Sequence, residues 1–559
     1  MARGTILTIK CSFCGKLAVE KSRFKMDGEN YVELECGHTV ITEALNPDEQ
    51  LWQDQLRDWS LKGLTPYPFQ IEGVKFLEAC DCNGLLLDEQ GLGKTIQTCM
   101  LLKRNPQLFP ALIVVKSGLR SQWFKEIFKW TGELAQVITS SREVPYFDLF
   151  NIVIVSIDSL RLLRSDCKPE TSEADKEVLK AMGKRVRDGK VVWTDEICAK
   201  FNFIVIDESQ KIKNPGASRT QALRLVAQAG IKVNGRKPRV LPMSGTNVEK
   251  HAGEFFNTLN LVQPEIFPNH QRFLRQHVQI ADGRYGGLRY PEHFRNLTKD
   301  FIIRRKRVDV LPELPKVFRQ FRLAEMEGDE LDAYIKVMKE FLKAAEDPAK
   351  PMMPQSLLGY MSRLRHCTGI AKVNAALEFV EEFMLETEVE RKLAIFLHHQ
   401  IAGEALLAKI EELCKIGNYN PPLYYHAKLD PLKERPAMEE AFKQPGNKIM
   451  LLSTQAAAEG LNLQFCSDCL IMERQWNPST EEQAEARFTR PGSTADRVNA
   501  HYLIAAGTID DFFTELVEIK RRNVAQTLDG VENEWDEKSL MAELGRVAME
   551  KGLRKWKLK

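Results

Sequence analysis

The chain has 559 residues, and at about 100 to 200 residues per domain this length predicts roughly three to five domains. Apolar residues make up 43% of the chain and charged residues 28%, which excludes wholesale disorder and a fibrous repeat. The 79 basic and 77 acidic residues leave a net charge of +2, so any contact with nucleic acid must come from basic residues concentrated on one surface.

The first stretch, residues 1–45, carries a cysteine and histidine pattern that is typical of a small zinc module. Cys11 and Cys14 form a CxxCG turn, and Cys36 and His38 follow after a spacer of 21 residues. Because both thiolates of such a turn can bind one metal ion, Zn²⁺ held by three cysteines and one histidine is the expected occupant. Isolated buried thiols are the alternative. The module could contact DNA, dock a protein partner or close the edge of the neighbouring domain.

The next two stretches differ in their patterns of apolar and charged residues. Residues 46–265 alternate short runs rich in Val, Ile and Leu with helix-length segments, which predicts a parallel sheet covered by helices on both faces. Strands are expected at 84–87, 111–115, 152–156, 203–206 and 240–243. Residues 266–385 are charged and helical, and they include a basic stretch, FIIRRKRVDVLPELPK, that is closed by prolines.

Residues 386–530 again alternate short apolar runs with helix-length segments. Residues 531–559 form a polar tail that ends KGLRKWKLK. Strands are expected at 393–397, 449–453, 470–473 and 500–504. The sequence therefore predicts an α/β protein with two parallel-sheet lobes, a helical region between them and two small ends. No apolar run approaches the roughly 18 residues of a membrane span, and most cysteines are scattered singly, as reduced thiols are. We expect a reducing cellular interior and no membrane partner.

A phosphate-binding loop is predicted after the first strand, in GLLLDEQGLGKTIQ. Backbone N–H groups at Gly91 and Gly93 can approach phosphate oxygens because no Cβ is in the way, and the helix that follows adds its positive end. Lys94 would neutralise the β- and γ-phosphates, and the Thr95 hydroxyl would coordinate Mg²⁺. Asp88 stands where the general pattern has glycine, so the match to that pattern is incomplete.

An acidic pair completes the predicted nucleotide site. Asp207 and Glu208 directly follow the strand expected at 203–206, and open α/β sheets bind ligands at this end of their strands. Asp207 would hold Mg²⁺, and Glu208 would orient the attacking water. Such a pair is by itself more often the start of a helix, but a phosphate loop in the same lobe favours a single site for a nucleotide.

From about residue 64 to about residue 526, segments in this order resemble the Swi/Snf-type ATPases of helicase superfamily two. That family consists of translocases on double-stranded DNA with two RecA-like lobes. In the segment TPYPFQIEGVKFL, the resemblance implies that Phe69 and Gln70 recognise the adenine base. In the phosphate loop, the family also has an acidic residue at the position of Asp88. In ALIVVKSGLRSQW it implies a DNA-contacting turn at Lys116. The coupling motif would be Ser244, Gly245 and Thr246.

The resemblance continues through the second lobe. It implies that Ser453, Thr454, Gly460 and Asn462 contact DNA and the edge of the nucleotide. It also implies that Arg487 and Arg490 are arginine fingers. Two arginines three positions apart share a helix face, and a guanidinium that reaches the γ-phosphate from the opposite lobe stabilises the transition state only when the lobes close.

Some residues depart from the family pattern. Gln210 and Thr489 replace histidines in two motifs, and Asn247 replaces a proline. The segments KLAIFLHHQ and LSTQAAAEGL lean toward the branch that includes annealing helicases and fork remodelers. No chromatin-reading segment is recognisable, which by analogy favours the cytoplasm of a prokaryote or a viral host over a nucleus.

The sequence therefore predicts a monomeric ATPase that uses ATP, Mg²⁺ and structural Zn²⁺ and moves along double-stranded DNA. A nucleotide-switched DNA-binding adaptor and a strand-separating or annealing helicase are the alternatives. The basic tracts at 301–322 and 551–559 each carry a net charge of +5 and could meet DNA phosphates, although such runs are often only solvated faces. An interlobe role is the other reading of the first tract.

Overall fold

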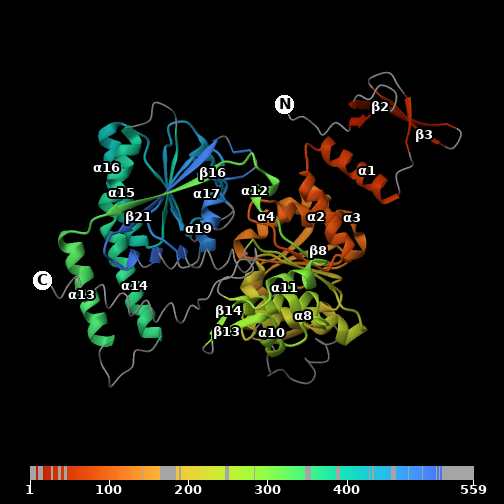
Figure 1. The fold of residues 1–559 in the computed structure, drawn as a ribbon, viewed down its shortest axis with the longest axis horizontal. Coiled ribbons are helices and arrows are strands. Elements are labelled where there is room, and N and C mark those ends of the chain that lie inside the picture. Colours follow the sequence, from red (N-terminus) through yellow and green to blue (C-terminus); the bar gives the residue numbers. More distant parts are fainter. Residues whose placement is uncertain are drawn as a thin grey trace.

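The fold is known from a computed structural model. It describes residues 8–10, 17–26, 29–34, 39–42, 47–140, 143–163, 184–187, 190–245, 251–281, 284–345, 354–385, 391–426, 428–430, 433–454, 461–475, 478–490, 492–493, 495–511, 513–514 and 517–518. Two parallel sheets lie side by side in Figure 1, one in each lobe, so the predicted α/β class with two parallel sheets is confirmed.

Lobe 1 is built on a five-stranded parallel sheet. Its strands, in spatial order, are β12 (Arg239–Pro242), β11 (Phe203–Ile206), β6 (Ala111–Val115), β8 (Ile152–Ser156) and β7 (Ala135–Ile138). The continuous Val, Ile and Leu runs of β6, β8 and β11 are fully buried, because helices cover both faces of the sheet. One face packs against α2 (Pro68–Ala79), α3 (Lys94–Arg104) and α4 (Arg120–Thr131). The other packs against α5 (Ile157–Leu163), α8 (Ser218–Asn234) and α9 (Phe256–Val262).

Two short strands extend the edge of this sheet beside β12. β5 (Leu85–Leu86) pairs in parallel with β15 (Ile302–Ile303), and Leu86 forms a bridge with Met243. Smaller elements complete the lobe: η1 (Pro106–Leu108), η2 (Ser117–Leu119), β9 (Lys184–Arg187), β10 (Lys190–Trp193), α7 (Asp195–Cys198), η3 (Ser209–Ile212) and η4 (Ala252–Phe255).

Lobe 2 is built on a six-stranded sheet in which every pairing is parallel. Its strands, in spatial order, are β16 (Lys316–Ala324), β21 (Arg497–Ala505), β20 (Asp468–Ile471), β17 (Leu393–Leu397), β19 (Ile449–Ser453) and β18 (Leu423–Tyr425). Side chains of α15 (Val373–Leu385) and α16 (Gln400–Gly417) form the core on one face. Those of α17 (Glu434–Lys443) and α19 (Pro478–Glu485) form the core on the other.

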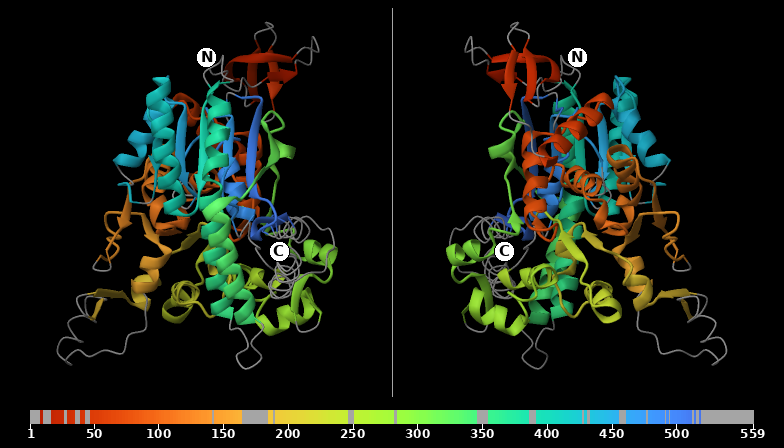
Figure 2. Two further views of the ribbon diagram at one scale, coloured as in Figure 1. Left: turned by 90° about the vertical axis from the view of Figure 1, so that its left-hand side faces the viewer. Right: turned by 90° about the vertical axis from the view of Figure 1, so that its right-hand side faces the viewer.

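The segment 266–385, expected as one helical connection, is divided between the lobes. Four elements pack on lobe 1: α10 (His270–His277), β13 (Val278–Ala281), β14 (Arg284–Leu288) and α11 (Pro291–Thr298). The chain then passes α12 (Arg307–Val310), which lies between the two sheets in Figure 1, and enters lobe 2 as β16. Next come α13 (Gly328–Ala345) and α14 (Pro354–Ala371), which share a core with Ile509 and Phe513 and project from lobe 2 (Figure 2).

The N-terminal stretch forms an antiparallel sheet of β1 (Thr8–Lys10), β2 (Leu17–Met26), β3 (Glu29–Leu34) and β4 (Thr39–Thr42). The following helix α1 (Pro47–Leu61) is attached to lobe 1, since the Trp59 indole donates to the carbonyl of Trp130 at 2.9 Å. The predicted zinc ligands Cys11, Cys14, Cys36 and His38 lie outside the described residues, as does the tail 531–559.

Within the part of the chain that the structure describes, no group of three or more metal-ligating side chains converges, and no helix is long and apolar enough to cross a bilayer.

Candidate nucleotide site between the lobes

The predicted residues of lobe 1 meet because their strands are parallel. β5, β6, β11 and β12 end at the same edge of the sheet, and each is followed there by a predicted functional segment. These segments are the phosphate loop at 88–94, Lys116, the pair Asp207 and Glu208, and Ser244 with Gly245.

The phosphate loop has the backbone that its glycines allow. Gly91 and Gly93 have φ angles of 88° and 72°, in the left-handed region that favours glycine. A Cβ at Gly93 would lie 2.3 Å from Nε2 of Gln70, so the Gln70 amide, which donates to the carbonyl of Leu92, would have to move. Lys94 Nζ donates to the carbonyls of Asp88 at 2.7 Å and Glu89 at 3.2 Å. Burial lowers the pKa of Lys94, and nearby carboxylates oppose this shift.

The predicted adenine-reading residues contact the same loop. Gln70 donates from Nε2 to the carbonyl of Leu92 at 3.1 Å and accepts from the Tyr67 N–H at 3.0 Å. Phe69 is buried against Leu92 and Leu311. The start of α2 and the phosphate loop are therefore one packed unit.

The acidic pair lies opposite Lys94. Asp207 accepts from the Trp123 indole N–H at 2.9 Å and from the backbone N–H of Glu208 at 2.9 Å. Burial and then the neighbouring Glu208 raise the pKa of Asp207 to about 6, against the hydrogen bond from Trp123 and the charge of Lys94. A buried carboxylate with an unfavourable charge beside it gains from a cation. Together with the half-buried Thr95 hydroxyl it supplies the oxygen donors that Mg²⁺ prefers, so these residues fit that ion.

A hydrogen-bonded chain joins the acidic pair to the predicted coupling motif. Gln210 donates from Nε2 to the Glu208 carboxylate, and the Ser244 hydroxyl donates to Gln210 Oε1 at 2.7 Å. Gly245 lies against the phosphate loop, because a Cβ there would be 2.5 Å from Cγ of Gln90. Thr246 and Asn247 lie outside the described residues. Gln210, at the family's histidine position, thus bridges two motifs by hydrogen bonds.

The turn of lobe 2 that carries Arg487 and Arg490 lies against this site, since a Cβ at Gly91 would be 3.7 Å from the carbonyl of Thr489. Burial lowers the pKa of Arg487, and the charge of the Glu208 carboxylate of lobe 1 counteracts the shift, so the two charged groups interact across the lobes. Burial and then Arg487 lower the pKa of Arg490 to about 9. The predicted shared helix face is wrong: α19 ends at Glu485, and both arginines lie in the turn that follows. In that turn the Arg487 N–H donates to the carbonyl of Ala484 at 3.1 Å, and the Arg487 carbonyl accepts from the Leu463 N–H at 3.1 Å.

Two of the other predicted residues of lobe 2, Ser453 and Thr454, lie at the carboxyl edge of its sheet. Ser453 ends β19, and the Thr454 hydroxyl donates to the carbonyl of Leu397 at 2.7 Å. Asn462 Oδ1 is buried and finds no hydrogen-bond partner within the described part of the chain. Gly460 lies outside the described residues. DNA contact by Lys116, Ser453, Thr454 and Asn462 stays a prediction.

Arg305 is a site residue that the sequence reasoning missed. Its backbone N–H and Nε donate to Asp88 Oδ1 at 3.1 and 3.0 Å, and its Nη2 donates to Gln97 Oε1 at 2.8 Å. Gln97 in turn donates to the other oxygen of Asp88 at 2.9 Å. Asp88 is fully buried, so its charge needs such a partner. The acidic residue at a glycine position was the available signal, but the sequence does not say which cation it pairs with.

Ion pairs also bear on the basic tract 301–322, for which the sequence left DNA contact, a solvated face and an interlobe role open. Four of its seven basic residues form ion pairs with carboxylates distant in sequence. The pairs are Arg305 with Asp88, Arg307 with Glu89, Arg319 with Glu485, and Arg322 with Glu382. The charges compensate acids in both lobes, which favours the interlobe role of this segment.

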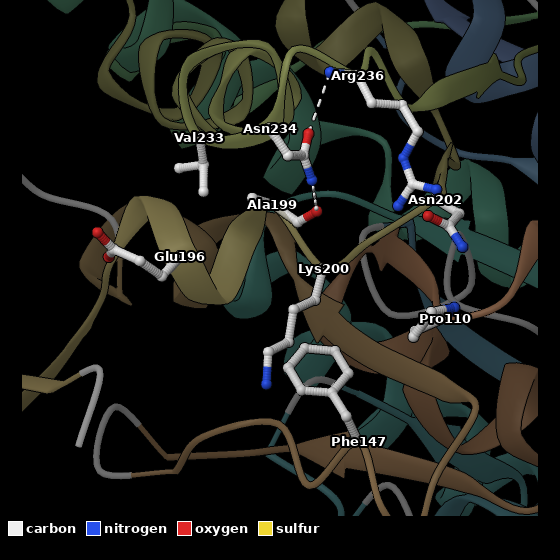
Figure 3. A pocket seen from close by; sticks show the side chains of 9 residues that line it. All are labelled: Pro110, Phe147, Glu196, Ala199, Lys200, Asn202, Val233, Asn234 and Arg236. Carbon is white, nitrogen blue, oxygen red and sulfur yellow. Dashed lines mark hydrogen bonds between the residues drawn. The ribbon is translucent and has the colours of Figure 1, made fainter. Parts of the chain in front are cut away.

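A pocket of about 400 Å³ lies at the opposite end of the lobe 1 strands (Figure 3). Its walls include Pro110 and Asn202, which directly precede β6 and β11, and the guanidinium of Arg236 points toward Asn202. Because the phosphate loop is at the other edge of the sheet, this pocket is no part of the nucleotide site.

A phosphate loop and an acidic pair on one parallel sheet, with a turn of the second lobe that carries two arginines beside them, define a two-lobed nucleotide hydrolase. Residues 69–371 match the model of the SNF2-related domain, and residues 374–492 match that of the helicase conserved C-terminal domain. The chain belongs to the SNF2-related family, and its class is that of a helicase-like ATPase.

Curated relatives are similar over most of this chain. The DNA annealing helicase and endonuclease ZRANB3 of Mus musculus is 27% identical over 480 residues, 83% of this chain and 41% of that protein. The SWI/SNF-related matrix-associated actin-dependent regulator of chromatin subfamily A-like protein 1 of Xenopus tropicalis is 27% identical over 507 residues, 88% of this chain and 47% of that protein. The chain spans less than half the length of these two relatives.

A bacterial relative and a solved structure are also similar. The uncharacterized ATP-dependent helicase MG018 of Mycoplasma genitalium is 26% identical over 496 residues, 82% of this chain and 42% of that protein. The Sulfolobus solfataricus SWI2/SNF2 ATPase core in complex with dsDNA is 21% identical, with a TM-score of 0.35 over 87% of this chain and 98% of that chain.

Proposed function

We propose that the protein is an ATP-driven translocase on double-stranded DNA, which moves along duplex and displaces or remodels bound protein or DNA structures. The observation that carries this proposal is that the lobe 2 turn holding Arg487 and Arg490 lies against the phosphate loop of lobe 1, where a Cβ at Gly91 would be 3.7 Å from the Thr489 carbonyl. The charge of Glu208 in lobe 1 also acts on Arg487. When hydrolysis needs groups from both lobes, each turnover is tied to a closing and opening of the cleft.

In this proposal each residue acts on the nucleotide from where it lies. Lys94 binds the phosphates, Glu208 orients the attacking water, and the two arginines stabilise charge that develops on the γ-phosphate. Mg²⁺ held by Thr95 and Asp207 would neutralise phosphate charge. Gln210 connects the group that orients water to Ser244, and through it to the loop beneath.

DNA is proposed to lie along the carboxyl edges of the two sheets, where Lys116 and Ser453 are found, with Asn462 as a further contact. One solved structure of similar sequence is described as a complex with dsDNA, which supports duplex as the substrate. Contacts of this kind reach phosphates, so binding should tolerate any sequence and weaken as salt rises.

The decisive experiment is ATP hydrolysis measured with duplex, single-stranded and forked DNA, with Lys94→Ala as the inactive control. We expect duplex to stimulate hydrolysis by the wild-type protein and Lys94→Ala to abolish it. Hydrolysis that is absent, or that does not depend on duplex, would contradict the proposal.

A strand-separating or annealing helicase is the second candidate, because ZRANB3 is described as a DNA annealing helicase. Unwinding of a tailed duplex, or ATP-dependent annealing of complementary strands, would favour it. A nucleotide-switched adaptor is the third. An adaptor should bind DNA with an affinity that changes with the bound nucleotide, while its ATP turnover stays very slow. Such a protein would not need all four of Lys94, Glu208, Arg487 and Arg490.

We further propose that Cys11, Cys14, Cys36 and His38 hold a structural Zn²⁺, in a module that contacts DNA or docks a protein partner. Metal analysis of the purified protein should give one zinc per chain, and Cys11→Ser with Cys14→Ser should lose it. Wild-type protein without stoichiometric metal would refute the module.

A further inference from the structure

The segment that leads from lobe 1 to lobe 2 follows the phosphate loop as a neighbouring strand. Leu85 and Leu87 donate to the carbonyls of Phe301 and Ile303 at 2.7 and 2.8 Å, and this ladder continues past β5 into the loop. There the N–H of Glu89 donates to the carbonyl of Arg305 at 3.0 Å. The interlobe segment therefore determines the path of the phosphate loop.

Arg307 is fixed on lobe 1 by three contacts of this segment. Its backbone N–H donates to Glu89 Oε2 at 2.8 Å, and its Nε lies 3.6 Å from the same oxygen. Four positions later, Leu311 is buried against Leu92 of the phosphate loop. The guanidinium is thus held by the loop itself.

The same guanidinium reaches lobe 2. Arg307 Nη1 donates to the hydroxyl of Thr489, a residue only 2% exposed. Thr489 stands between Arg487 and Arg490, in the turn that carries both. A Cβ at Gly91 would lie 3.7 Å from the Thr489 carbonyl and 3.9 Å from Arg307 Cδ, so all three residues meet at one point.

We propose that Arg307 is a positioning residue, which sets the two lobe 2 arginines over the phosphate loop through its hydrogen bond to Thr489. This inference rests on the proposed ATP hydrolysis between the lobes. Lobe 2 acts on Arg307 by two routes, the hydroxyl of Thr489 and the chain itself, which enters β16 at Lys316. The contact forms when the lobes close and places the arginines only then.

The test uses Thr489→Val, which removes the hydroxyl with almost no change of shape, and Thr489→Ser, which keeps it. Thr489→Val and Arg307→Ala should each lower kcat about tenfold, because a misplaced catalytic group is costly, while the dissociation constant for a nonhydrolysable nucleotide changes less than about twofold. Thr489→Ser should retain wild-type kcat. Since the two residues act as one contact, the double variant should be no slower than the slower single variant.

Arg363→Ala is the matched control, since Arg363 forms an exposed ion pair with Glu340 on the α13 and α14 hairpin, away from the cleft. It should leave kcat unchanged. Losses that add up in the double variant, an unchanged kcat in Thr489→Val, or a loss confined to nucleotide affinity would each overturn the inference.

A second measurement separates this inference from the proposed function. Spin labels on unnatural amino acids at Gln107 in lobe 1 and Glu412 in lobe 2 report the distance between the lobes with bound nonhydrolysable nucleotide. Thr489→Val and Arg307→Ala should lengthen or broaden that distance even if the wild-type protein hydrolysed no ATP. Distances that match the wild type in both variants would overturn the role of Arg307, whereas lost hydrolysis alone would count against the proposed function.

Discussion

Each lobe has a carboxylate shortly after a strand of its parallel sheet, but the pKa values of the two carboxylates are shifted in opposite directions. Asp207 directly follows β11 in lobe 1, and Glu473 follows β20 by one residue in lobe 2. Burial and the adjacent Glu208 raise the pKa of Asp207 to about 6. Burial would raise the pKa of Glu473 as well, but the hydrogen bond and charge of His399 and the charge of Lys372 outweigh it and hold the pKa at about 2.

Hydrogen bonding explains the difference. Glu473 accepts from the backbone N–H groups of His398 and His399 at 2.8 and 2.9 Å and from the His399 ring. Asp207 has the Trp123 indole and one backbone N–H, and it faces a second carboxylate. A carboxylate saturated with donors holds a structure together, whereas one left short of positive charge is ready for a cation. This contrast favours the lobe 1 edge as the place where Mg²⁺ and the nucleotide phosphates bind.

The largest expected effect tests that assignment directly. Glu208→Gln keeps the size of the side chain and a hydrogen bond to Gln210, but it cannot help to remove a proton from water. We expect kcat for ATP to fall about 10²- to 10³-fold with nucleotide binding retained, measured by steady-state hydrolysis on duplex DNA. Glu292→Gln, an exposed residue of α11, is the control. Hydrolysis near the wild-type rate would mean that the chemistry lies elsewhere.

A smaller effect is expected at the lobe 2 carboxylate. Because the pKa of Glu473 is lower in the folded protein than its ordinary 4.5, the unfolded chain takes up protons first as the pH falls. The lowered pKa of Glu473 contributes about 3 kcal/mol to the free energy of unfolding. This contribution is complete above about pH 4.5 and is lost as the pH falls from there to about 2. Glu473→Gln should remove most of it and flatten the acid dependence of the free energy of unfolding, measured in urea.

The control for that variant is Glu382→Gln, which breaks the exposed ion pair with Arg322 and should cost less than about 1 kcal/mol. Equal losses in the two variants would show that Glu473 is no more than a surface charge, and the contrast between the lobes would fail.

The smallest effect concerns the pH dependence of metal binding. Below about pH 6 Asp207 is protonated, so affinity for Mg²⁺ with nucleotide should fall as the pH drops through that value. The Trp123 N–H stabilises the carboxylate, so Trp123→Phe should raise the pKa and move the midpoint upward by less than about one unit. Trp130→Phe in the same helix, whose indole donates to Glu126 instead, should leave the midpoint in place. A downward shift in Trp123→Phe would reverse the assignment.

Buried strands were the part of the fold that the sequence predicted best. The runs 111–115, 152–156, 203–206, 393–397 and 449–453 are confirmed as β6, β8, β11, β17 and β19 with the same bounds. A parallel strand covered on both faces must be apolar at every position, so its signal is continuous. β16 lacks that signal because it is an edge strand, and its mostly exposed side chains, KVFRQFRLA, were interpreted as a basic tract.

Residues of the nucleotide site could be predicted where a short sequence motif marks them. Gly91, Gly93 and Lys94 stand in one motif, and Asp207 follows a strand. The bond from Arg305 to Asp88 joins residues 217 positions apart, and no local pattern connects them. The turn after α19 was also missed, because a helical pattern in EEQAEARFTR does not say where the last hydrogen bond forms.

The ion pair between Asp88 of the phosphate loop and Arg305 has a consequence for synthesis on the ribosome, because Arg305 is added much later than Asp88. Asp88 and Arg305 are 217 positions apart, so at about 5 to 20 residues per second the guanidinium is added about 10 to 40 s after the carboxylate. During that interval Asp88 would be a buried charge without its cation, which is costly. A nascent first lobe should therefore not bind ATP until the chain has grown into the segment that leads to lobe 2.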